Sequence, residues 1–216
     1  MRKFTYPLIA LGGAAVLSLG TLQAQDSAPQ LPGQIDTSRV EAGTYATDPG
    51  HTLVAWRVNH FGFNDYIGLF GNVEGTLEMD PANPSAASLD VTIPIAGVTT
   101  ASEGLTEHLT RAGQDGGEPD FFGPSPEPAR FVSTSVEPTG DTTATITGDL
   151  TMNGMTHPVT IEAEFTGAGA NPMSSTQTIG FEGTTTIQRS QWGVDGFIPM
   201  VGDEVELMIT AAFEMQ

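Results

Sequence analysis

The feature that most constrains this chain is the alternation of apolar and polar side chains along most of its length. Between residues 52 and 60, for example, Val54, Trp56 and Val58 fall on one face of an extended chain. A period of two is typical of a strand with one buried and one solvated face. The pattern recurs to the end of the sequence, so we predict an antiparallel all-β fold.

About eight such segments follow one another, and several approach ten residues, a length of roughly 33 Å. The predicted strands are 52–60, 68–80, 87–95, 130–137, 143–152, 158–165, 178–188 and 204–214. Asn153-Gly154 predicts a two-residue hairpin turn, and Ser102 is placed to cap a short helix that ends at Leu109. The pattern is compatible with two packed sheets or with one sheet closed into a barrel, which would have an interior.

The first residues have the character of an export signal. A basic start at Arg2 and Lys3 leads into an apolar run over residues 8–19, and Leu22-Gln23-Ala24 resembles a cleavage site. We therefore predict a cleaved signal peptide over residues 1–24, a flexible leader over residues 25–42 and one barrel domain over residues 43–216. The alternative is that the apolar run remains as an uncleaved anchor.

Composition restricts the partners. The chain has no cysteine, which excludes disulfides, a thiol nucleophile and a thiolate metal site. Once residues 1–24 are removed, five arginines stand against 26 acidic residues, a formal charge of −21. Nucleic acids and anionic lipid surfaces require a basic surface, so neither is an expected partner. Stable insertion into a membrane is not expected either, because a charged outer face is costly in lipid.

An ordered series of short motifs runs through the same region. The motifs are Asp48-Pro49-Gly50-His51-Thr52, Val58-Asn59-His60-Phe61-Gly62, His108-Leu109, Asp120-Phe121-Phe122, Pro128-Ala129-Arg130-Phe131, the hairpin over residues 148–159, and Arg189-Ser190-Gln191-Trp192-Gly193. In this order the set resembles the YceI-like family of bacterial periplasmic proteins, from about Gly43 to the end of the chain. Residues 113–119 look like an insertion relative to the family spacing, in a loop that could border the mouth of the barrel.

The resemblance implies an eight-stranded antiparallel, lipocalin-like barrel with one short helix. It also implies an apolar tunnel that holds isoprenoid lipids, including isoprenoid quinones, without catalytic activity. On this basis we expect a soluble periplasmic binding protein that transports or stores a polyisoprenoid or isoprenoid quinone. The lipid is then a ligand, no catalytic cofactor is expected, and a homodimer is left open.

The apolar strand faces supply the predicted contacts with the ligand tail. Removing an apolar chain from water contributes about 25 cal/mol per Å², and a few polar groups at one end suffice to orient a head group. The alternative is a barrel filled by its own side chains. The predicted tail contacts are Val54, Trp56, Val58, Leu69, Val73, Leu77, Val91, Ile93, Ile146, Leu150, Ile161, Phe165, Phe181, Val205, Leu207 and Ile209.

Three polar residues are predicted near the head group: His60, His108 and Arg189. His60 shares the apolar face of its strand, and Arg189 has the geometry to pair with a carboxylate or a phosphate. The alternative is that these three residues only stabilise the protein, Arg189 through a salt bridge. The histidines form no dense metal-binding motif, so no metal ligand and no catalytic residue are predicted. The second functional hypothesis is a metal- or carboxylate-dependent hydrolase on the same barrel.

Overall fold

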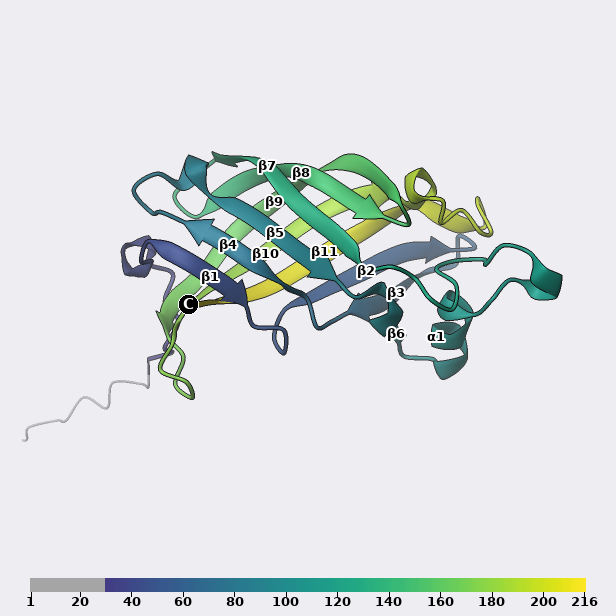
Figure 1. Cartoon of the computed structure of the whole chain (residues 1–216), viewed down its shortest axis with the longest axis horizontal. Coiled ribbons are helices and arrows are strands. Elements are labelled where there is room, and N and C mark those ends of the chain that lie inside the picture. Colours follow the sequence, from purple (N-terminus) through teal and green to yellow (C-terminus); the bar gives the residue numbers. More distant parts are fainter. Residues whose placement is uncertain (1–29) are drawn as a thin grey trace, which may run out of the picture. The chain divides into compact units, whose positions relative to one another are not determined.

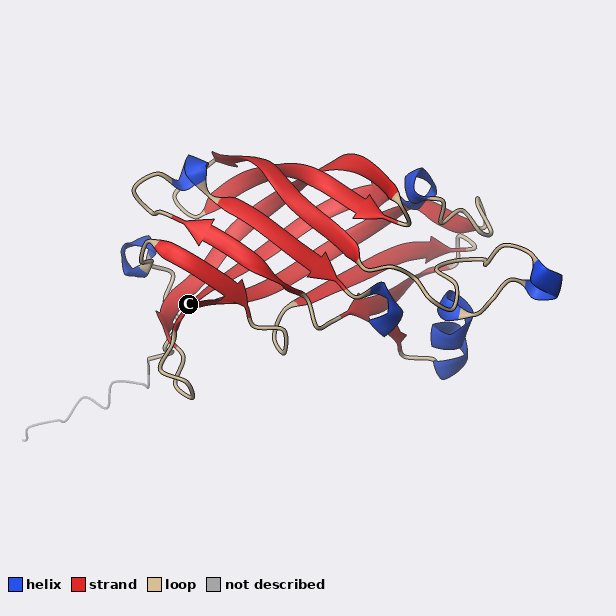
Figure 2. Ribbon diagram, in the orientation of Figure 1, coloured by secondary structure: helices blue, strands red, loops and turns tan. Residues whose placement is uncertain are grey.

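The computed structural model describes residues 30–216, and its strands form one antiparallel sheet that closes on itself (Figures 1 and 2). The described strands are β1 (Gly43–Thr47), β2 (Leu53–His60), β3 (Asn64–Phe70), β4 (Glu74–Met79), β5 (Ser88–Ile93), β6 (Thr99–Thr100), β7 (Ala129–Pro138), β8 (Thr143–Met152), β9 (Met155–Ala170), β10 (Gln177–Gln188) and β11 (Val201–Met215). The helical segments are α1 (Glu103–Thr110) and the 3-10 turns η1 (Thr37–Arg39), η2 (Pro84–Ala86), η3 (Ile95–Gly97), η4 (Gln114–Gly116) and η5 (Arg189–Trp192).

The strand order shows how the barrel closes. Strands follow in the order β1-β4-β5-β7-β8-β9-β10-β11, and β1 then pairs with β11. β2 also pairs with β11, β3 pairs with β2, and β6 pairs with β3. The pairs β1/β2, β4/β3 and β5/β6 therefore occupy three positions of the barrel as interrupted strands, which gives eight positions in all. The predicted eight-stranded antiparallel barrel with one short helix is confirmed.

One predicted strand is divided in two, which corrects one residue of the predicted lining. We expected a single strand over residues 68–80, but β3 ends at Phe70 and Asn72 takes a left-handed φ of 54°. The break shifts the alternation, so that Phe70 and Val73 are both buried. Leu69, which we placed on the inner face, pairs with Ala55 on the outer face and is 39% exposed.

The predicted hairpin turn and helix are found close to their expected places. Asn153 and Gly154 have φ values of 51° and 74°, as a turn with two left-handed residues requires. Ser102 occupies the N-cap position of α1, but its side chain makes no capping hydrogen bond. Instead, the Thr100 hydroxyl donates to the Ser102 carbonyl and accepts from the Ser102 amide, which fixes the entry into α1.

Two inward-facing aromatic rings lie over glycines of neighbouring strands. A Cβ atom on Gly68 would lie 2.1 Å from Cζ2 of Trp56, and one on Gly148 would lie 2.4 Å from Cζ of Phe131. Any side chain at these positions would displace the ring. The two glycines therefore let large rings lie against the wall of the barrel.

Most of the turns lie at two ends of the barrel (Figure 1). At the helix end lie α1, the β2–β3 turn, the loop that carries η4, and the segment between η5 and β11. At the opposite end lie the β4–β5, β7–β8 and β9–β10 turns and the C-terminus. We call this the hairpin end; the Asn153-Gly154 turn is not part of it. Between residues 30 and 216 no helix is long and apolar enough to cross a membrane.

Part of the predicted leader falls within the described residues. Gln34 forms an isolated bridge with Ala168 of β9, and Val40 packs against the apolar cluster at the hairpin end. These contacts connect residues 34–40 to the barrel. The predicted signal peptide, residues 1–24, lies outside the described residues.

Candidate ligand-binding site

The barrel encloses an apolar cavity of about 880 Å³. A cavity of this size falls within the range of small-molecule binding sites. Its lining includes the exposed residues Phe61 and Phe197 at the helix end and the exposed residues Pro138 and Asp141 at the hairpin end. The cavity therefore extends from one end of the barrel to the other, and the barrel is not filled by its own side chains.

The alternation of the strands accounts for most of the lining. Of the residues predicted to contact a ligand tail, every one except Leu69 lines the cavity. Leu69 lies on the outer face, for the reason given above. The inner faces of strands on all sides of the barrel thus converge on one apolar space.

Several aromatic residues of the lining were not among the predicted contacts. Phe70 meets Phe122 edge to face, with ring centroids 5.8 Å apart, and Phe213 meets Phe181 at 6.1 Å. Phe213 lies on the apolar face of its predicted strand, so the pattern carried a signal for it. Phe70 was not predicted because the break at Asn72 shifts the apolar–polar alternation. Phe122 was not predicted because it lies in a loop, which has no such alternation.

His60 lies in the lining at the helix end. Its ring packs edge to face against Phe61, with centroids 4.4 Å apart, and β2 pairs it with Val201 of β11. Within residues 30–216 its ring nitrogens have no hydrogen-bond partner. This histidine therefore offers a donor or acceptor at the mouth of a largely apolar cavity.

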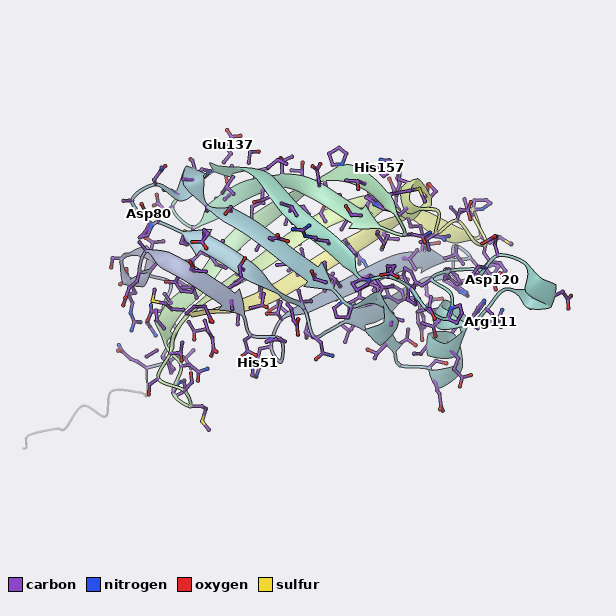
Figure 3. All side chains as sticks on the ribbon, viewed as in Figure 1. His51, Asp80, Arg111, Asp120, Glu137 and His157 are labelled. Atoms are coloured by element: carbon purple, nitrogen blue, oxygen red, sulfur yellow. The ribbon has the colours of Figure 1, made fainter. Side chains whose placement is uncertain are left out.

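His108 also lines the cavity, but Nε2 of its ring is engaged. Nε2 lies 2.8 Å from Oδ2 of Asp120, and Arg111 donates to the same carboxylate oxygen at 2.9 Å. Figure 3 shows Arg111 and Asp120 beside each other at the helix end. The hydrogen bonds from Arg111 and then from His108 lower the pKa of the Asp120 carboxyl below its usual value. This group connects α1 to the segment that carries Phe121 and Phe122.

Arg189 is buried, at 5% exposure, and holds the segment that leads into β11. Nε donates to the Gly202 carbonyl, Nη1 donates to the Val194 carbonyl, and Nη2 donates to the carbonyls of Gly196 and Val201. Burial lowers the pKa of the guanidinium. Four of its five N–H groups are thus engaged with backbone oxygens, whereas the structural alternative we considered was a salt bridge with a carboxylate.

The two tryptophans differ in their hydrogen bonding. Nε1 of Trp192 donates to the Leu150 carbonyl at 3.1 Å. Nε1 of Trp56, in the cavity lining, is buried without a partner among residues 30–216. An unpaired buried donor costs about 1–3 kcal/mol. The structure retains this donor in the wall of the cavity.

The remaining histidines are far from one another. His51 lies beside Asp48 in the β1–β2 connection, and the ring of His157 packs edge to face on Trp192 at 5.2 Å. Figure 3 places His51 and His157 on opposite sides of the barrel. In the part of the chain that the structure describes, no group of three or more His, Cys, Asp or Glu residues is arranged to hold a metal ion. The hydrolase hypothesis finds no support in this arrangement.

The loop that resembles an insertion lies away from the cavity. None of residues 113–119 belongs to the cavity lining, and η4 projects outward at the helix end (Figure 1). The lining resumes at Phe121. The loop therefore leaves the mouth of the cavity unobstructed.

These features define a small closed β-barrel with an apolar cavity along its axis. The chain matches the model of the YceI-like domain over residues 45–213, and it belongs to that family. The resemblance noted from the sequence motifs is confirmed.

Relatives and solved structures agree with this assignment. A UPF0312 protein of Pseudomonas putida is 34% identical over 197 residues, which cover 91% of this chain and 90% of the relative. The YCEI protein of Campylobacter jejuni has a TM-score of 0.59 and 26% identity, covering 73% of this chain and 90% of that one. A polyisoprenoid-binding domain from Saccharophagus degradans has a TM-score of 0.57 at 10% identity, covering 82% of this chain and all of that domain, which shows a shared fold.

Proposed function

We propose that this protein binds the chain of an isoprenoid lipid or isoprenoid quinone inside the barrel and acts as a carrier or store rather than as an enzyme. The observation that carries the proposal is the apolar cavity that extends between the two ends of the barrel. A long, flexible hydrocarbon chain suits such a space because burial removes it from water along its whole length. The polyisoprenoid-binding domain of Saccharophagus degradans, which shares the fold, supports the choice of ligand class.

The head group would lie at the helix end, beside His60. The imidazole there has no hydrogen-bond partner within residues 30–216 and stands at the boundary between the apolar lining and the surface. His108 would form part of the wall, because Nε2 of its ring is held by Asp120. We assign Arg189 to the support of this end, since its donors are used by backbone carbonyls.

Native mass spectrometry of the gently purified protein, followed by extraction of bound molecules, tests the function. We expect a prenyl lipid or isoprenoid quinone at one molecule per chain. A protein that is purified empty is then offered ubiquinone and a polyprenol. Failure to take up either compound would contradict the proposal.

We also propose that the protein works in the periplasm after export by the signal over residues 1–24. The support is the basic, apolar and small-residue pattern of that segment together with the excess of acidic residues in the remainder of the chain. N-terminal sequencing of protein from the periplasmic fraction should begin at Gln25. A chain that retains residues 1–24 and sediments with membranes would contradict cleavage.

A further inference from the structure

Two segments without Asp, Glu, Lys or Arg border the mouth of the cavity at the helix end. They are residues 60–64, at the β2–β3 turn, and residues 196–201, which lead into β11. Neither segment contains Asp, Glu, Lys or Arg, in a chain whose formal charge is −19. We call these two segments the apolar rim.

The large side chains of the apolar rim are exposed. The exposed fractions are 89% for Phe63, 50% for Met200, 45% for Phe61, 40% for Phe197 and 37% for Ile198. A single exposed apolar residue is ordinary, but a group of exposed apolar residues is typical of a surface that contacts a protein partner, a membrane or a ligand.

The two segments form one surface. The Phe61 amide donates to the Met200 carbonyl at 2.7 Å, and His60 pairs with Val201. Phe197 extends the surface toward α1, because its ring lies edge to face on His108 with centroids 5.8 Å apart. The surface is therefore continuous around this part of the mouth.

The apolar rim is also continuous with the interior. Phe61 and Phe197 are partly exposed to solvent, and both belong to the lining of the cavity. Phe63, Ile198 and Met200 are exposed and lie outside the lining. An apolar surface thus leads from the outside of the molecule into the barrel.

We propose that the apolar rim docks on the surface of a lipid bilayer and that the ligand enters and leaves the barrel through the mouth that the rim borders. This proposal rests on the proposed function. An isoprenoid chain that crosses water exposes its whole apolar surface, whereas passage through a docked mouth keeps the chain covered. A bilayer supplies and receives such chains, whereas a second copy of this protein on the rim would cover the mouth.

The surrounding charges favour an uncharged bilayer surface. Asp65 and Asp195 directly flank the two segments, and α1 carries Glu103 and Glu107. The basic side chains nearby are paired, Arg111 with Asp120 and Arg57 with Glu206. Phosphatidylcholine should therefore be preferred over an anionic lipid, and added salt should reduce the difference by screening the repulsion.

The test compares two acidic substitutions at opposite ends of the barrel. Phe63→Asp alters the apolar rim, and Met173→Asp alters an exposed residue, 92% accessible, in the β9–β10 turn at the hairpin end. Neither residue lines the cavity. Co-flotation with phosphatidylcholine vesicles, with and without phosphatidylglycerol, gives the partition coefficient. We expect Phe63→Asp to reduce it by about tenfold or more and Met173→Asp to leave it unchanged.

Uptake of ubiquinone from a cyclodextrin solution, without vesicles, separates this proposal from the proposed function. Both variants should bind ubiquinone like the wild type, while Phe63→Asp slows transfer to acceptor vesicles. Equal partition of all three proteins, or equal loss in both variants, would overturn the docking proposal and leave the binding function intact. The proposal would also be overturned if Phe63→Asp converted a dimer into a monomer without changing the partition coefficient.

Discussion

At the scale of single residues, the structure separates side chains that support the barrel from those available to a ligand. Arg189 and His60 were both predicted near the head group, and both line the cavity. Arg189 donates four hydrogen bonds to backbone carbonyls, so its chemistry is used within the protein. Sequence cannot reveal this difference, because the carbonyls that Arg189 contacts belong to a segment without a periodic pattern.

Replacing Arg189 should therefore affect stability. We expect Arg189→Met to lower the free energy of unfolding by about 3 kcal/mol or more, because buried carbonyls lose charge-assisted partners. Arg57→Met is the matched control, since Arg57 is exposed and paired with Glu206, and its loss should cost about 1 kcal/mol or less. Urea unfolding of the two variants measures the difference, and equal costs would show that Arg189 has no special structural role.

Replacing His60 should instead affect binding. His60→Phe keeps a ring in the wall but removes the polar nitrogens, so we expect ubiquinone affinity to fall by about five- to tenfold. Affinity for squalene, which has no head group, should not change. His157→Phe, outside the cavity lining, serves as the control. A similar loss for both ligands would mean that His60 acts only through packing.

At the scale of elements, the alternation of apolar and polar residues predicts the long strands, but it does not predict where a strand is interrupted. The strand expected over residues 143–152 is found as β8, and the strands expected over 52–60 and 178–188 differ from β2 and β10 by a single residue. β1 was not predicted, because it has only five residues and obtains its place from pairing with β4 and β11. The break at Asn72 also depends on tertiary contacts, and it decided the direction in which Leu69 points.

The attachment of α1 to the segment at Phe121 gives a prediction on pH. The pKa of Asp120 is lowered in the folded protein, so its contribution to stability is present above the ordinary aspartate pKa of about 3.9. That contribution is lost as the pH falls through the lowered value. We expect the free energy of unfolding of the wild type to exceed that of Asp120→Asn by about 1 kcal/mol at neutral pH. The two free energies should converge in acid.

Urea unfolding at a series of pH values measures this convergence. Asp115→Asn, an exposed position in η4 whose left-handed backbone suits asparagine, is the control. A constant difference between wild type and Asp120→Asn down to acidic pH would show that the carboxylate charge is not responsible.

At the scale of the whole molecule, the sequence predicts most of the residues that line the cavity of the barrel. Alternation placed every residue of the predicted tail contacts except Leu69 in the cavity lining, because a closed sheet turns its apolar faces inward. The presence of open space could not be read from the sequence, since side-chain volume and barrel geometry decide it together. The exposed apolar rim was also missed, because its exposed apolar side chains lie between strands, where no periodic pattern marks them.

Obstruction of the cavity should abolish the binding of long chains. Ile209 lies on the inner face of β11 between Val54 and Gly183, and Thr210 is the next residue on the outer face. We expect Ile209→Trp to weaken ubiquinone binding by about tenfold or more, because the indole occupies the space of the chain. Thr210→Trp adds the same side chain outside and should bind normally, as measured by native mass spectrometry.

The central claim, that the ligand lies inside the barrel, is tested most directly by NMR of the two indole N–H groups. Trp56 lines the cavity, whereas Trp192 is almost fully buried outside the lining and donates to Leu150. In a nitrogen-15 spectrum, assigned with Trp192→Phe, added ubiquinone should shift the Trp56 signal and leave the Trp192 signal in place. An unmoved Trp56 signal in a protein that has bound ubiquinone would contradict the account.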